Sequence, residues 1–211
     1  MSIVVHQLAL GTMDNFVYVI EDEFRACAIV DPAWDVSAIL ACIQSRKLEL
    51  VYILLTHGHF DHTDGLEDCL AYKDVPVYMS KQELPKLIPN QPNMIFTNDN
   101  DIIPFGSNHI KIMHTPGHSP GGQCFYIDNH LITGDTLFIN GCGRCDLGGS
   151  SLDDMYNSLE KIKSLPDETL IYPGHHYDDK SMDTLGNQKK TNRFLVCQNK
   201  DEFIRKRNRK K

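Results

Sequence analysis

The stretch Thr56-His57-Gly58-His59-Phe60-Asp61-His62 decides the fold and the chemistry of this 211-residue chain. It follows a continuous apolar run, Glu49–Leu55, which has the length and composition of a strand buried on both faces. Side chains two residues apart on an extended segment point to the same side, so the first two histidines can bind one metal ion. The aspartate and the last histidine lie past the bend and can face a second ion. A His-rich surface loop is the alternative, but four such side chains at a strand end favour a metal site.

Three more polar side chains come directly after apolar strands and lie next to glycine. They are His118, Asp135 and His175, in the segments Thr115-Pro116-Gly117-His118, Thr133-Gly134-Asp135 and Tyr172-Pro173-Gly174-His175. Because α/β enzymes gather their site residues at strand ends, these side chains can converge on the first cluster. Imidazole and carboxylate are ligands for Zn²⁺ or Fe²⁺, whereas Mg²⁺ and Ca²⁺ prefer oxygen ligands alone. The other five histidines lack this context and are expected to be ordinary surface or core groups.

Composition excludes several classes of protein. With 41% hydrophobic and 23% charged residues, the chain is neither collagen-like nor broadly disordered. No apolar run approaches the roughly 18 residues of a membrane span, so no membrane association is expected. Residues 1–10 have no basic region and no small-residue cleavage site, and the seven cysteines are an odd, scattered set. We therefore expect a cytoplasmic protein with reduced thiols.

The net charge of −7 conceals a basic end of the chain. Residues 205–211 carry six of the 21 lysines and arginines and no acidic residue, so the rest of the chain is strongly acidic. Because nucleic-acid affinity comes mostly from positive charge, we expect no nucleic-acid partner. Charged runs at chain ends are often disordered, and disorder is the expected state of 205–211.

The hydrophobic pattern predicts an α/β protein in which strands outnumber helices. The expected strands are 2–10, 15–21, 25–30, 49–55, 75–79, 102–105, 110–115, 122–128, 130–133 and 170–172. The expected helices are 36–47, 63–73 and 151–164, with a loop-rich connector at 80–100 and a glycine-rich loop at 134–149. Because no linker separates these elements, we expect one domain over 1–211, with two sheets face to face and helices outside.

The order and spacing of the seven polar residues resemble the metallo-β-lactamase superfamily over nearly the whole chain. The resemblance implies the αββα four-layer sandwich, in which two mixed β-sheets pack face to face with helices outside. It also implies two divalent metal ions, with Zn²⁺ as the first choice and Fe or Mn as alternatives. The first ion would be held by His57, His59 and His118. The second ion would be held by Asp61, His62 and His175, and Asp135 would bridge the two ions.

The same resemblance implies a hydrolytic mechanism. A hydroxide between the ions would be the nucleophile, because metal binding lowers the pKa of water to about 7. Asp61 and Asp135 are the expected catalytic carboxylates, and both ions would polarise the carbonyl under attack. No serine or cysteine triad is then needed.

The stretch Asp135–Arg144 resembles a loop shared by two branches of the superfamily, glyoxalase II (hydroxyacylglutathione hydrolase) and the persulfide dioxygenases. Both branches act on glutathione derivatives. Arg144-x-Asp146 is similar to the dioxygenases, and the segment after His175 is shorter than the helical domain of glyoxalase II. Gly174-His175, in contrast, departs from the Ala-His of the dioxygenases, which work with one Fe(II). The sequence leaves the branch open.

The leading prediction is a metal-dependent hydrolase of a thioester or related ester, similar to glyoxalase II. The alternative is an iron-dependent dioxygenase acting on glutathione persulfide. A non-catalytic metal-binding module is less favoured, because it needs no hydroxide-generating site. The substrate is expected to be a small molecule, with a glutathione conjugate as the first candidate. Arg144 is expected to bind a substrate carboxylate, unless it forms an internal salt bridge. Tyr177 is expected to donate a hydrogen bond to substrate. The strand at 1–10 is a candidate homodimer edge.

Overall fold

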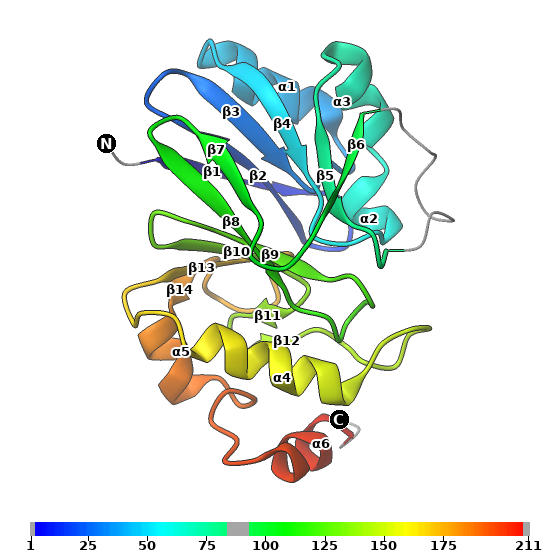
Figure 1. Cartoon of the computed structure of the whole chain (residues 1–211), viewed down its shortest axis with the longest axis vertical. Helices are drawn as coiled ribbons and strands as arrows, with labels where there is room; N and C mark the ends of the chain where they lie inside the picture. The colour runs from blue at the N-terminus through cyan, green and yellow to red at the C-terminus, as the bar shows by residue number, and fades with distance from the viewer. Residues whose placement is uncertain (1–2, 84–92, 209–211) are drawn as a thin grey trace.

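Two six-stranded β-sheets stack face to face and form the middle of the molecule (Figure 1). The computed structural model describes residues 3–83 and 93–208. The first sheet has the order β1-β2-β3-β4-β5-β6, antiparallel from β1 to β3 and parallel from β3 to β6. Its strands, in that order, are Val4–Leu10, Asn15–Glu21, Ala26–Val30, Glu49–Leu54, Val77–Ser80 and Met94–Thr97.

The second sheet has the order β14-β13-β10-β9-β8-β7 and is antiparallel except between β10 and β13. Its strands are Ile102–Phe105 (β7), Asn108–His114 (β8), Gln123–Ile127 (β9), His130–Gly134 (β10), Leu170–Pro173 (β13) and Asp183–Thr184 (β14). Both sheets are therefore mixed, as expected. The predicted glycine-rich loop contains a small hairpin of its own, formed by Leu137–Phe138 (β11) and Gly141–Cys142 (β12).

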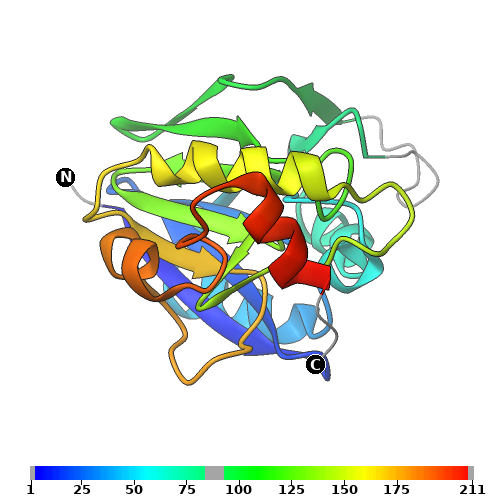
Figure 2. The same cartoon turned by 90° about the horizontal axis from the view of Figure 1, so that it is seen from below.

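Helices cover the outer faces of both sheets (Figure 1, Figure 2). On the first sheet lie α1 (Val36–Ser45) and α3 (Leu66–Tyr72); beyond the second lie α4 (Leu152–Lys163), α5 (Leu185–Thr191) and α6 (Lys200–Asn208). The side chain of Asp35 caps α1 by accepting a hydrogen bond of 3.1 Å from the backbone of Ala38. The predicted αββα sandwich is confirmed.

The alternation of side chains along β2 shows how one strand serves two hydrophobic layers. Val17 and Val19 belong to the apolar cluster beneath α1 and α3, whereas Tyr18 and Ile20 belong to the cluster between the sheets. Successive side chains of a strand point to opposite faces, so a fully apolar run fits a strand that is covered on both sides. A third cluster, which includes Met155 of α4, lies between the second sheet and its helices.

The connector expected at 80–100 contains one strand that the sequence did not indicate. β6 pairs in parallel with β5, from Val77 opposite Met94 to Ser80 opposite Thr97. A run of four residues is too short for its periodicity to stand out, so the neighbouring strand defines it. Residues 84–92 of the connector lie outside the described residues.

The helix expected at 63–73 is the shorter α3, and a separate helix of one turn, α2 (Phe60–Thr63), precedes it. Gly65 lies at the break, and its amide donates a hydrogen bond of 3.1 Å to the carbonyl of Pro32. A Cβ at this position would lie 2.6 Å from Cγ2 of Val36, so an ordinary side chain does not fit against the start of α1. The break leaves the end of the His-rich motif on the short helix α2.

The basic end of the chain is helical as far as the structure describes it. We expected 205–211 to be disordered, but α6 continues through Asn208, and the remaining residues lie outside the described part. Phe203 of this helix is fully buried and packs 5.7 Å from the ring of Phe194, between centroids. This contact anchors α6. A single buried residue gives no periodic pattern, which is why the sequence did not predict it.

Two features of the fold concern the predictions about a membrane and about a homodimer. None of the helices within residues 3–83 and 93–208 is long and apolar enough to cross a membrane. β1 is an edge strand of the first sheet, as a homodimer through this strand would require. The homodimer itself stays a prediction.

Candidate metal centre

The seven candidate ligands come from the ends of four strands and form one cluster. His57 and His59 follow β4, and α2 carries the other two ligands of the same motif. His118 follows β8, Asp135 follows β10, and His175 follows β13. The fold thus brings together every residue that the sequence proposed as a metal ligand.

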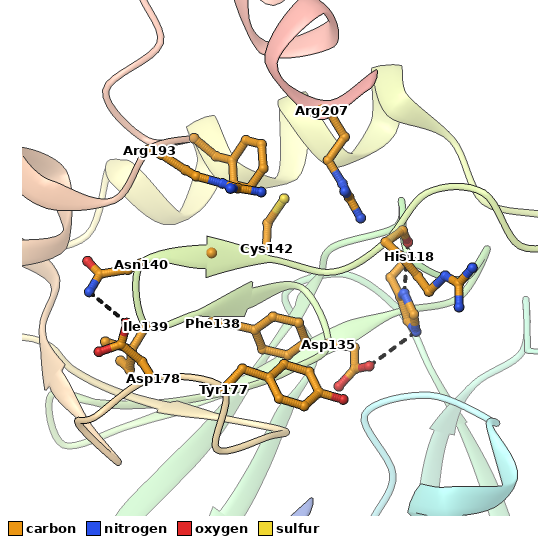
Figure 3. Close-up of a pocket in the computed structure, with 13 residues that line it drawn as sticks. His118, Asp135, Phe138, Ile139, Asn140, Cys142, Tyr177, Asp178, Arg193 and Arg207 are labelled. Carbon is orange, nitrogen blue, oxygen red and sulfur yellow. Dashed lines mark hydrogen bonds and ion pairs between the residues drawn. The ribbon is translucent and has the colours of Figure 1, made fainter. Parts of the chain in front are cut away.

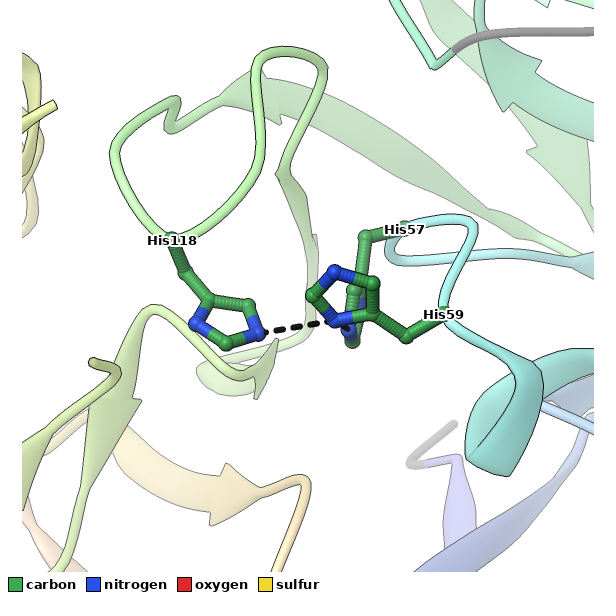
Figure 4. Close-up of side chains that lie close together, drawn as sticks. All are labelled: His57, His59 and His118. Carbon is green, nitrogen blue, oxygen red and sulfur yellow. Dashed lines mark hydrogen bonds between the residues drawn. The ribbon is translucent and has the colours of Figure 1, made fainter. Parts of the chain in front are cut away.

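Three imidazole nitrogens form the first set of the cluster (Figure 4). Nε2 of His57 and Nε2 of His118 each lie 3.0 Å from Nδ1 of His59. The ligand atoms of this set all lie within 4.8 Å of one another. Three nitrogens at this spacing can bind one ion and leave a position open, as in catalytic zinc sites.

Asp61, His62 and His175 form the second set, and all three are buried. Nε2 of His62 lies 3.2 Å from Nε2 of His175. Oδ2 of Asp61 lies 3.5 Å from each of these nitrogens. Two imidazoles and a carboxylate can bind a second divalent ion.

Asp135 lies between the two sets. Its Oδ2 is 3.3 Å from Nε2 of His118 in the first set. Its Oδ1 is 3.4 Å from Nε2 of both His62 and His175 in the second set. Oδ1 is buried and has no hydrogen-bond partner among the described residues. Because a buried carboxylate oxygen without a partner is costly, this position fits a bound cation.

Two histidines have their outer ring nitrogens fixed by backbone carbonyls. Nδ1 of His118 lies 2.9 Å from the carbonyl oxygen of Arg144, and Nδ1 of His175 lies 2.8 Å from that of Met13. A carbonyl oxygen only accepts hydrogen bonds, so Nδ1 carries the proton in both rings. In their neutral forms both rings therefore present an Nε2 lone pair to the cluster, as metal ligands do.

Asp31 fixes two further histidines, one from each set. Its Oδ2 lies 3.0 Å from Nδ1 of His62 and accepts a hydrogen bond of 2.6 Å from Oγ1 of Thr56. Because the Thr56 hydroxyl donates to Asp31, it accepts from Nδ1 of His57, which lies 3.0 Å away. Asp31 is buried and was not among the residues predicted from the sequence. Its only signal there was its position at the end of a predicted strand.

The Nε2 atoms of His62 and His175 in the second set point toward one another. In the neutral forms of His62 and His175, two lone pairs lie 3.2 Å apart, and a cation between them would remove the repulsion. Burial alone would lower the pKa of His62, but the carboxylates of Asp135 and Asp31 raise it well above its ordinary value. A proton and a metal ion thus compete for this nitrogen, and metal binding weakens as the pH falls.

Two other members of the cluster are held in the form that binds metal. Burial lowers the pKa of His57 well below its usual value, and the neighbouring His62 acts in the same direction. Burial alone would raise the pKa of Asp135, but His62 and His175 outweigh it and hold the pKa well below the usual range. At neutral pH the imidazole of His57 is therefore neutral and Asp135 is ionised.

Asn15 and Trp34 orient Asp61, and the sequence indicated neither. The indole nitrogen of Trp34 donates a hydrogen bond of 2.8 Å to Oδ1 of Asn15. This contact fixes the Asn15 amide with its Nδ2 toward Asp61, where it donates to Oδ2 at 3.1 Å and to the backbone carbonyl at 2.9 Å. The carboxylate is thus positioned before any ion binds.

A pocket of about 470 Å³ opens beside the cluster (Figure 3). Tyr177 lies in its wall, with the phenol ring stacked 4.7 Å from the ring of His175. Arg144 also lines the pocket, but its guanidinium donates two hydrogen bonds, of 2.7 and 2.9 Å, to Asp146. The internal salt bridge that was the alternative for Arg144 is therefore present. Substrate contacts of Arg144 and Tyr177 stay predictions.

Other residues of the pocket wall were missed from the sequence. They come from the β11–β12 hairpin and from the segment after β13, where the pattern predicted no element. They are Phe138, Ile139, Asn140, Gly141, Cys142, Asp178, Arg193, Phe194 and Arg207.

Comparison with known proteins identifies the family. The sequence profile of the Metallo-beta-lactamase superfamily matches residues 10–175, so the chain belongs to that superfamily. The chain is 36% identical over 210 residues to the "Probable polyketide biosynthesis zinc-dependent hydrolase BaeB" of Bacillus velezensis, covering 98% of this chain and 93% of that one. It is 37% identical over 164 residues to the hydroxyacylglutathione hydrolase of Nitrosomonas eutropha, covering 78% of this chain and 62% of that one.

A solved structure extends the comparison. The crystal structure of ETHE1 from Myxococcus xanthus superimposes with a TM-score of 0.87 at 25% identity, covering 98% of this chain and 90% of that one. These relatives fit the glyoxalase II and persulfide dioxygenase branch, which confirms the resemblance seen in the sequence. The names of the relatives and the His/Asp groups of the cluster support a hydrolase superfamily member that uses divalent metal.

Proposed function

We propose that this chain is a dinuclear metallohydrolase that cleaves a thioester of a small thiol. The observation that carries the proposal is a pair of ligand sets with Asp135 between them, its Oδ1 buried and without a hydrogen-bond partner among the described residues. The name zinc-dependent hydrolase, borne by two relatives, supports Zn²⁺ as the metal. The two ions would be held by His57, His59 and His118 and by Asp61, His62 and His175.

Bound ions at these sets would supply Lewis-acid polarisation of a carbonyl and a water whose pKa is about 7. The residues of the chain position the reactants. Asp61 and Asp135 offer carboxylate oxygens that orient an attacking water, and the low pKa of Asp135 keeps it ionised at neutral pH. Burial raises the pKa of Tyr177 to about 12, so its phenol keeps its proton and can donate a hydrogen bond to substrate.

The substrate class follows from the relatives and from the pocket. Relatives named hydroxyacylglutathione hydrolase support a thioester, because such a substrate joins an acyl group to a thiol. The pocket has room for the thiol half beside the cluster. We expect a thioester carbonyl to lie against Asp135 and the rest of the substrate to extend along the pocket.

The alternative is the oxidation of glutathione persulfide with one Fe(II). The likeness to ETHE1 and the Arg144-x-Asp146 pattern support it. Gly174 favours the hydrolase, because a Cβ at this position would overlap Oδ1 of Asp135 and lie 3.0 Å from Cε1 of His62. The alanine typical of the dioxygenases does not fit beside an Asp135 that reaches the second set.

Two assays on the same preparation test the proposal. Protein loaded with zinc, iron or manganese is supplied with a hydroxyacylglutathione while thiol release is followed, and with glutathione persulfide in an oxygen electrode. We expect thiol release and no oxygen uptake. Oxygen uptake by protein with one iron per chain, without thiol release, would replace the hydrolase by the dioxygenase. Turnover of neither substrate class, with metal bound, would support a binding module.

A substitution in the first set separates the metal mechanism from unspecific effects. His57→Ala is expected to lose the first ion and all hydrolysis, because it removes one of three ligands. His109→Ala is the matched control, since His109 is exposed on β8 and lies outside the cluster. A fully active His57→Ala protein would contradict the proposal.

A further inference from the structure

Two arginines from the end of the chain line the pocket and share one aromatic ring. The guanidinium carbon of Arg193 lies 4.5 Å from the centroid of the Phe194 ring, and that of Arg207 lies 5.8 Å from it. Both side chains lie on the pocket wall near Cys142 (Figure 3). The ring holds two positive charges at the same end of the pocket.

Neither arginine forms an ion pair among the described residues, although the charge of Arg207 also acts on Asp146 and Cys145. No carboxylate of residues 3–83 or 93–208 forms an ion pair with Arg193 or Arg207. Nε of Arg207 is buried and lacks a hydrogen-bond partner there. Arg144, in contrast, is paired with Asp146. Two neighbouring cations that form no ion pair repel each other, so an anion bound at this end of the pocket would be stabilised.

The other polar groups of this wall do not neutralise the arginines. Burial raises the pKa of Cys142 to about 12, so its thiol is uncharged at neutral pH. Two acidic side chains line this pocket among the described residues: Asp135 belongs to the metal cluster, and Asp178 accepts a hydrogen bond of 3.0 Å from Nδ2 of Asn140. The charge of the arginine pair is therefore available to a ligand.

We propose that Arg193 and Arg207 bind an anionic group, a phosphate or a carboxylate, on the thiol half of the substrate. The proposal rests on the proposed function, since it assumes a thioester whose carbonyl lies at the metal cluster. The same pocket reaches from His118 and Asp135 at the cluster to the arginine pair. Cellular thiols that form thioesters, such as glutathione and phosphopantetheine, carry their anions at a distance from the sulfur.

The guanidinium group suits this role. Its planar fork donates two parallel hydrogen bonds to a carboxylate or phosphate, and two such forks match a doubly charged phosphate. Both arginines follow residue 175, where the match to the superfamily profile ends. The anion subsite is thus built by a part of this chain that the superfamily profile does not describe.

Matched pairs of thiols measure the subsite directly. Calorimetry gives the Kd of 4′-phosphopantetheine against pantetheine, which differ in the phosphate alone, and of glutathione against its diethyl ester, which differ in the carboxylates. Because each pair shares its thiol, any contact of sulfur with metal cancels. We expect the anionic member of at least one pair to bind roughly ten- to a hundredfold more tightly, as loss of hydrogen bonds to a charged group predicts.

The variants assign this preference to the arginines. Arg193→Gln/Arg207→Gln is expected to abolish the preference, whereas Arg207→Lys, which keeps the charge and loses the fork, is expected to retain part of it. Arg205→Gln is the control, because Arg205 is exposed on the same helix and lies outside the pocket. Circular dichroism and metal content establish that each variant is folded. If the double variant is not folded, a reduced preference in Arg207→Lys, together with wild-type binding that weakens as salt rises, tests whether the arginines bind the anion.

The outcomes are distinct from those of the activity assays. A preference in the phosphate pair identifies phosphate as the anion, and one in the carboxylate pair identifies carboxylate. Equal affinities within both pairs, or a preference that survives in the double variant, would overturn the subsite. A binding preference without thioester hydrolysis would support the subsite and refute the proposed function. Hydrolysis without a binding preference would support the proposed function and refute the subsite.

Discussion

Replacing Gly174 by alanine is predicted to disable the second ligand set while the fold remains. The Gly174 amide donates a hydrogen bond of 2.9 Å to the carbonyl of Gly134, and Phe16 donates one of 2.8 Å to the Gly174 carbonyl. The backbone is therefore held from both sides. A Cβ added here would overlap Oδ1 of Asp135 and lie 3.0 Å from both Cε1 of His62 and the carbonyl carbon of Gly134.

The size of the effect of Gly174→Ala depends on which neighbouring group can shift away from the added Cβ. The Gly134 carbonyl belongs to β10 and cannot withdraw, so the Asp135 side chain has to shift. Overpacking of this kind costs about 1–3 kcal/mol, and we expect the free energy of unfolding of the metal-free protein to fall by about 2 kcal/mol. Disturbing the positions of metal ligands lowers affinity by about 10–100-fold, which is the loss expected for the second ion.

The assay is a zinc titration against a competing chelator, with denaturant unfolding of the metal-free protein beside it. Gly148→Ala is the matched control, because a Cβ at Gly148 would meet no atom within 4 Å. The expected result is normal affinity for the first ion and weakened affinity for the second in Gly174→Ala alone. Wild-type affinity for both ions in Gly174→Ala would refute the reasoning.

Three more predictions concern the contacts around the cluster and one distant carboxylate. Asp31→Asn should lower the free energy of unfolding by about 3 kcal/mol and weaken metal binding, because an amide has a single oxygen and cannot accept both from the Thr56 backbone at Oδ1 and from the Thr56 hydroxyl and His62 at Oδ2. Trp34→Phe removes the donor that fixes the Asn15 amide, so it should cost about 1 kcal/mol and weaken the second ion more than the first. Burial would raise the pKa of Asp183, but hydrogen bonds from neighbouring amides lower it below its ordinary value. The ionised Asp183 therefore stabilises the fold fully above about pH 4, and this stabilisation is lost as the pH falls through the folded-state pKa. Asp183→Asn should flatten the fall of stability in acid.

Each of these predictions is paired with a control or with an outcome that contradicts it. Asp128→Asn replaces an exposed aspartate that shares the positive φ of Asp31, and it should leave both stability and metal affinity unchanged. Unaltered chelator competition in Trp34→Phe would show that the Asn15 amide does not depend on the indole. An acid unfolding profile that is the same in Asp183→Asn and wild type would contradict the assigned pKa direction.

The metal cluster was predictable because its ligands lie in a His-rich motif after a buried strand and in three strand-end segments that contain glycine. His118, Asp135 and His175 each lie within four residues of the end of a strand, and strand ends were visible in the hydrophobic pattern. The αββα layering was predictable for the same reason, since continuous apolar strands such as β4 require cover on both faces.

The rest of the site depends on contacts that no local pattern carries. Asp31 is one aspartate among many until the fold brings it to His62, 31 residues away. Arg207 belongs to a basic run that predicts disorder, and the burial of Phe203 and the Phe194 ring hold it at the pocket. β6 likewise becomes a strand by pairing with β5. Such residues act through tertiary neighbours, so their role emerges with the structure.

The most direct test of the account is the number of ions bound per chain. Elemental analysis of zinc-saturated protein, after removal of free metal, should give about two ions for wild type and about one for His175→Ala, which lacks a ligand of the second set alone. One ion in the wild type, or the same number in both proteins, would contradict the dinuclear centre on which the proposed hydrolysis depends.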